Sequence, residues 1–215
     1  MRSSITYTSY VIRRTMLWIM IIVFLNFFLR IGNIGNGLDL YMGIFHMTLL
    51  SMPMIIVTSN MSYDGTLRSG PLLRYGRQKS FLSYMIVTVI MDLLITVVSS
   101  VFYILNFGCS GMDVLYVLVY FGQLIVFSTG LAFMYILVSR TFALCVFAVI
   151  IFMENILAIL PIPFELYSPF FGNVLFHRDF HLTDVVLDLV RIVSMILIMS
   201  FISSRYMKRK DVLDD

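Results

Sequence analysis

Residues 81–107 read FLSYMIVTVIMDLLITVVSSVFYILNF, an apolar run in which Asp92 is the only charged residue. An α-helix rises about 1.5 Å per residue, so about 20 residues cross the roughly 30 Å hydrocarbon core of a bilayer. The run is therefore long enough to form a membrane-spanning helix.

Five further apolar runs lie on either side of this one, near residues 16–31, 41–57, 113–138, 142–160 and 185–204. Hydrophobic residues make up 60% of the chain and charged residues 13%. A soluble globular chain has roughly half and roughly a quarter, respectively. The sequence therefore predicts one all-α transmembrane domain over residues 1–215, with six spanning helices and lipid as a large part of its solvent.

The positions of the basic residues predict how the chain is oriented. Cytoplasmic loops of membrane proteins are enriched in lysine and arginine. A cytoplasmic N-terminus places twelve of the fifteen basic residues on the inner side, and both chain ends are then expected in the cytoplasm: Arg2, Arg13, Arg14, Arg68, Arg74, Arg77, Lys79, Arg140, Arg205, Lys208, Arg209 and Lys210.

Residues 1–15 mix apolar side chains with three of these arginines. The mixture suits a short amphipathic helix at the inner membrane surface. The alternative is a tail whose arginines only fix the orientation.

The outer connection over residues 161–183 is expected to be broken rather than to form one continuous span. It contains three prolines and a glycine, which interrupt helices, among several aromatic residues. It is either an aromatic anchor at the outer interface or a half-inserted lid.

The inner connection over residues 60–80 alternates apolar and cationic side chains after a Gly-Pro step: Leu72, Leu73, Arg74, Tyr75, Arg77 and Lys79. A short helix there, continuous with the third span, would pass force from a cytoplasmic partner into the membrane. The alternative is that the charges follow only the general inner-side bias and rest on anionic lipid.

Polar residues inside the expected spans are the other candidates for function. Asn26, Asp92 and Glu154 lie at similar depth, ~16–20 Å from the inner ends of their spans, and Arg191 lies ~10 Å from its outer end. A lone charge in the bilayer costs roughly 2.5–3.5 kcal/mol, so cancelling pairs are expected. Asp188 precedes Arg191 by three residues and is its nearest candidate partner. These groups either lock spans together or line a translocation path.

Catalytic and metal-binding patterns are missing from the sequence. It has no phosphate-binding Gly-Lys loop, no serine elbow and no paired-histidine helix. We therefore expect no catalytic residue, no metal site and no cofactor on this chain, and membrane lipid rather than nucleic acid as its surroundings.

The run from Leu72 to Lys79, between the second and third spans, resembles the same loop in type-2 ABC exporter permeases. The small permeases of Gram-positive peptide, bacteriocin and antibiotic exporters are the most similar in pattern, with a basic surface helix, six spans and a broken outer segment. The resemblance implies a subunit that does not itself hydrolyse ATP. It would work with a second protomer, in a homo- or heterodimer, and with a separate cytoplasmic ATPase that binds ATP and Mg.

In that family the loop docks on the ATPase, which would assign docking here to Leu72, Leu73, Arg74, Tyr75 and Arg77. The location implied is the plasma membrane of a bacterium, and the cargo a peptide or other amphipathic compound. The chain departs from larger members in having almost no external domain and a very short tail, which leaves the substrate open.

Two other functions stay open at this point. One is a small-molecule binding subunit or ion-coupled carrier that depends on Asp92 or Glu154. The other is a membrane protein that confers immunity by sequestering a peptide.

Overall fold

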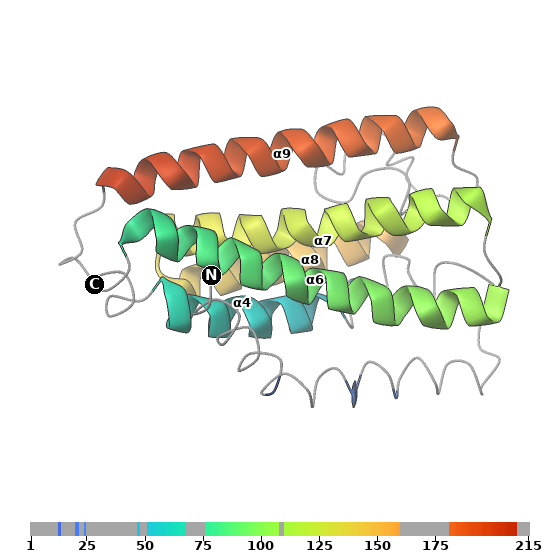
Figure 1. Ribbon diagram of the computed structural model, residues 1–215, viewed down its shortest axis with the longest axis horizontal. Helices are drawn as coiled ribbons and strands as arrows, with labels where there is room; N and C mark the ends of the chain where they lie inside the picture. Colours follow the sequence, from blue (N-terminus) through green and yellow to red (C-terminus); the bar gives the residue numbers. More distant parts are fainter. Residues whose placement is uncertain are drawn as a thin grey trace.

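The computed structural model describes residues 51–67, 76–107, 110–159 and 181–209, with isolated positions at Arg13, Met20, Ile21, Phe24 and Met47. This part of the chain is helical and contains no strand, as the sequence predicts. Its helices lie side by side along one axis (Figure 1): α4 (Met52–Thr66), α6 (Arg77–Phe107), α7 (Gly111–Leu137), α8 (Arg140–Ile159) and α9 (Leu182–Arg209).

Three helices are long and apolar enough to cross a membrane, over Gln78–Leu105, Gly111–Leu137 and Leu182–Met207, and a shorter apolar helix covers Arg140–Ile150. The outer face of α9 carries apolar side chains that no other part of the bundle covers. Leu187 is 65% exposed and Leu197 63% exposed. Such a face suits hydrocarbon rather than water, so the chain is a helical membrane protein.

Several expected elements fall outside the described residues. These are the surface helix over 1–15 and the span over 16–31, apart from isolated positions, most of the span over 41–57, and the broken outer segment over 161–183.

The inner connection is shorter than the sequence predicts. Helix α4 continues beyond the expected span end at Val57 to Thr66, and α6 begins at Arg77, so the helices are joined by residues 67–76. The second half of α4 contains several polar residues, and a hydropathy profile predicts a loop for such a stretch. Several of them are buried against other helices, and Thr58 donates to the Ile55 carbonyl at 3.1 Å.

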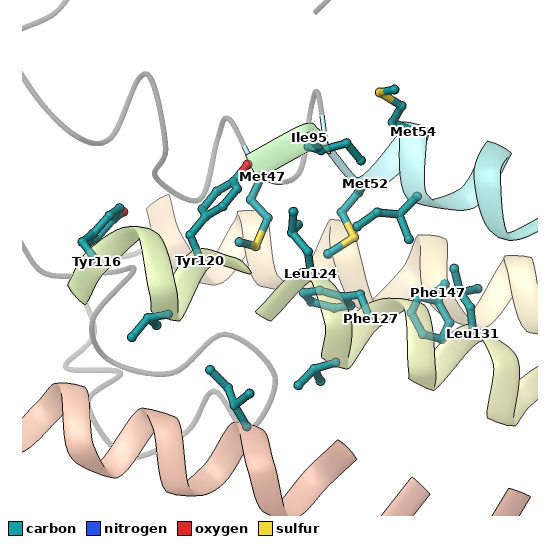
Figure 2. Packing of buried hydrophobic residues seen from close by; sticks show 14 of the residues in the cluster. Met47, Met52, Met54, Ile95, Tyr116, Tyr120, Leu124, Phe127, Leu131 and Phe147 are labelled. Atoms are coloured by element: carbon teal, nitrogen blue, oxygen red, sulfur yellow. The ribbon is translucent and has the colours of Figure 1, made fainter. Parts of the chain in front are cut away.

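Helix α7 is the centre of the bundle and contacts α4, α6, α8 and α9. Figure 2 shows Tyr120, Leu124 and Phe127 on this helix among buried side chains of α4 and α8. Gly122 leaves room for α9, because a Cβ there would lie 3.0 Å from Ile192 Cγ2.

One end of the bundle is defined by a buried cluster that includes Leu67, Tyr84, Ile136 and Met207. The cluster brings the ends of α4, α7 and α9 to the start of α6. Neighbouring helices along the described chain therefore run in opposite directions, as Figure 1 also shows.

The described basic side chains are concentrated at one end of this antiparallel bundle, although Asp64 of α4 also lies there. Lys79 at the start of α6, Arg140 at the start of α8 and Arg205 near the end of α9 belong to the end that holds the buried cluster. Asp113 and Asp184, in the first turns of α7 and α9, belong to the opposite end. We call these the basic end and the acidic end.

Candidate functional site

A polar stripe runs along the buried side of α6, with a member at almost every helical turn: Ser80, Tyr84, Thr88, Asp92, Thr96, Ser99 and Tyr103. Each of these residues is at most 5% exposed. Residues spaced by three or four positions share one helix face, so the stripe is a continuous polar line through a membrane-spanning helix.

Asp92 lies in the middle of this stripe, ~22 Å along the helix from its start. The residue is fully buried, and Ser128 of α7 donates its hydroxyl proton to Asp92 Oδ1 at 2.9 Å. The second oxygen, Oδ2, has no hydrogen-bond partner, and no described cation forms an ion pair with this carboxyl. A cancelling charge is expected because a lone charge in the bilayer is costly, and none is found for Asp92 within the described residues.

Polar side chains of α4 and α7 face the same region. The hydroxyls of Ser51 and Tyr120 are 2.6 Å apart and share a hydrogen bond. The Tyr84 hydroxyl approaches Ser59 of α4 without the geometry of a hydrogen bond. The interface of these three helices is therefore unusually polar for the interior of a membrane bundle.

Arg191 of α9 places a charged side chain at the α7–α9 interface. It donates from Nη2 to Gln123 Oε1 at 2.8 Å, and its Nε lies 3.6 Å from Asp188 Oδ1. Both charged side chains are largely buried, at 20% and 7% exposure. The pair expected from the i, i+3 spacing is thus brought together, and the amide of Gln123 ties it to α7. This arrangement supports the role of locking spans together.

A second polar node lies at the basic end and joins α4 to the α7–α8 turn. Asn60 Oδ1 accepts from Arg140 Nε at 2.7 Å and from the Tyr135 hydroxyl at 3.0 Å. Arg140 Nη1 also donates to Asp64 Oδ1 at 2.9 Å. The Tyr63 and Tyr135 rings meet edge to face with centroids 5.3 Å apart. Three residues on one face of α4 therefore hold the turn that starts α8.

The remaining sequence candidates are placed only in part. Arg77 is the first residue of α6, and Glu154 lies in α8. For each of these two residues the structure describes the backbone only. Asn26 and the candidate docking residues Leu72–Tyr75 lie outside the described residues.

Sequence reasoning missed the node around Asn60, because its members are separated by 75 to 80 positions and no local pattern links them. The polar stripe of α6 was detectable, since serine, threonine and tyrosine recur there with helical spacing. Hydropathy averages conceal such a stripe, because the apolar residues of the other helix faces dominate the average.

No group of three or more metal-ligating side chains occurs among the residues that the structure describes. Comparison of the chain with protein-family models, with curated proteins and with solved structures finds no match. The functional argument therefore rests on the arrangement of the residues themselves.

Proposed function

We propose that the chain is the membrane-spanning permease subunit of an ATP-driven exporter. In this proposal six spans leave both chain ends in the cytoplasm, and two protomers enclose a path through the plasma membrane of a bacterium. The cargo is a peptide or another amphipathic compound, and a separate ATPase supplies the energy.

The observation that carries the proposal is the architecture of the basic end. Residues 67–76 join α4 to α6 there, and α6 leaves that end as one helix of 31 residues, Arg77–Phe107. Such a helix is ~46 Å long, enough to extend through the whole bilayer. Basic residues favour the cytoplasmic side, so this connection is well placed to meet a cytoplasmic partner.

The partner binds ATP and Mg and docks on the connection at Leu72, Leu73, Arg74, Tyr75 and Arg77. Closure of the partner on ATP presses on the start of α6 and on the buried cluster beside it. The path between protomers then opens to the other side. This chain supplies the path, and the partner supplies the chemistry.

The test measures the hydrolysis of ATP by the copurified complex in vesicles. Arg74→Glu combined with Arg77→Glu should abolish the stimulation of hydrolysis by the permease. Arg205→Glu is the matched control, because it reverses a basic charge at the same end but on α9, which is not part of the connection. Stimulation that is equal in the wild type and the double variant refutes the docking role.

The proposed orientation has a test of its own. A reporter fused after Lys79 should be protected from reagents added outside intact cells. Accessibility from outside would place the connection on the wrong face of the membrane and remove the basis for ATPase docking.

A second candidate, an ion-coupled carrier, is favoured by the buried carboxyl of Asp92. A group of this kind inside a membrane is a functional-site hypothesis by default. The carrier predicts uptake or efflux in vesicles that contain only this chain and an ion gradient, and loss of that flux in Asp92→Asn. The exporter predicts no flux without the ATPase.

A further inference from the structure

Four polar atoms where α4, α6 and α7 pack together are buried and have no hydrogen-bond partner among the described residues. Tyr84 of α6 lies near Ser59 of α4, Ser99 of α6 lies near Tyr120 of α7, and Asp92 of α6 accepts from Ser128 of α7, so these atoms share one interface. We call this interface the polar seam, and its unpartnered atoms are Ser59 Oγ, Tyr84 Oη, Asp92 Oδ2 and Ser99 Oγ.

Threonines on α4 and α6 show how a polar residue in these spans can find a hydrogen-bond partner within its own helix. Each donates its hydroxyl proton to a carbonyl of its own helix, as threonine commonly does: Thr58 to Ile55, Thr66 to Ser62, Thr88 to Tyr84 and Thr96 to Asp92. The serines, the tyrosine and the carboxyl of the seam make no such bond. Their polar atoms therefore require partners from outside their own helices.

Two pairs of hydroxyl groups in the seam approach each other without forming a hydrogen bond of good geometry. They are Tyr84 with Ser59, and Tyr120 with Ser99. A bridging water satisfies two such groups at once, because it both donates and accepts. Lipid offers no equivalent, since Ser59, Tyr84 and Ser99 are fully buried and hydrocarbon has no hydrogen-bonding group.

Asp92 gives the seam a charge preference. Its carboxyl lies between the Tyr84 and Ser99 levels, which are ~22 Å apart along α6, and Ser128 of α7 donates to it. A carboxylate accepts hydrogen bonds and attracts cations, and no described cation occupies that role here.

We propose that the polar seam is a hydrated site inside a single copy of the chain, which admits water and small hydrophilic cations to Asp92. It is independent of the proposed export path, because that path lies between two copies whereas the seam lies within one. The seam would be present equally in an exporter subunit and in a carrier.

The test uses thiol chemistry in vesicles, in a background that carries Cys109→Ala and Cys145→Ala. Ser59→Cys and Ser99→Cys place thiols in the seam, and Val87→Cys places one in a buried apolar position of α6 as the control. Thiosulfonate reagents modify ionised thiols in contact with water. The seam thiols should react with a small ethylammonium reagent, and the control thiol should not.

The charge preference is tested with an anionic reagent of similar size. A nearby carboxylate should make thiol modification by the cationic reagent about tenfold faster than modification by the anionic reagent. This is the order of magnitude expected from a unit charge at short range in a protein interior. Asp92→Asn should remove that difference. Seam thiols as unreactive as the Val87→Cys control, or a preference unchanged in Asp92→Asn, overturn the proposal.

A measurement on the unsubstituted chain guards against variants that do not fold. Hydroxyl-radical labelling requires water beside the side chain, so Tyr84 should be labelled although it is buried. Phe127, which is 1% exposed in the apolar core, serves as the internal control. Labelling of Tyr84 no greater than that of Phe127 counts against a hydrated seam.

Discussion

Arg140 is the residue whose replacement tests the packing of the basic end most directly. Arg140→Met keeps a long apolar stem but removes the donors that reach Asn60 Oδ1 at 2.7 Å and Asp64 Oδ1 at 2.9 Å. A hydrogen bond from a charged donor contributes about 1.5–3 kcal/mol. The contact with Asp64 contributes only about 0.2–1 kcal/mol, because an ion pair between exposed side chains is screened by solvent. We expect a loss of about 2–4 kcal/mol in the free energy of unfolding, the sum of these two terms.

The two contributions can be separated by double-mutant cycles on the free energy of unfolding, measured by titration with denaturing detergent in mixed micelles. One cycle combines Arg140→Met with Asn60→Ala, and the other combines it with Asp64→Asn. The coupling to Asn60 should exceed the coupling to Asp64, whose side chain is 44% exposed. Added salt should weaken only the Asp64 coupling. A larger coupling to Asp64, or none to Asn60, would refute the reasoning.

Three further substitutions have expected outcomes in the same unfolding assay. Gly122→Ala should destabilise by about 1–3 kcal/mol, because the added Cβ would meet Ile192 at 3.0 Å, whereas Gly111→Ala, with open space around it, should not. Gly76→Ala should lose about 1–2 kcal/mol because Gly76 has a φ of 81°, and Gly76→Asn should lose less. Ser110→Ala should lose about 1 kcal/mol, since Ser110 accepts the backbone N–H at the start of α7 as an N-cap; a loss of helix stability near zero would contradict this.

Long apolar runs predicted the helices well. The expected spans at 81–107, 113–138, 142–160 and 185–204 correspond to α6, α7, α8 and α9, with ends that differ by a few residues. The periodicity and length of an apolar run are local properties, so they can be read from the sequence. The observed bounds of α4 differ most from the predicted span. Hydropathy does not distinguish a polar residue in a loop from one buried against another helix.

The candidate site could be predicted only where partners are close in sequence. Asp188 and Arg191 lie on one helical turn, and their contact follows from that spacing. The Ser128 partner of Asp92 lies 36 positions away, and the Asn60 partner of Arg140 lies 80 positions away. Such contacts depend on which helix faces pack together, and a single sequence does not determine that choice.

The packing of the basic end also bears on how the chain would move if the proposed export function holds. A tilt of α6 alone would pull Tyr84 away from Leu67, Ile136 and Met207, and so break a buried cluster that involves α4, α7 and α9. The node around Arg140 joins α4 to the start of α8 at the same end. Protein interiors are close-packed and switch between discrete arrangements rather than deform gradually. In the proposed exporter, a push on residues 67–76 is therefore expected to rotate the described helices as one body against a second protomer, rather than to tilt α6 by itself.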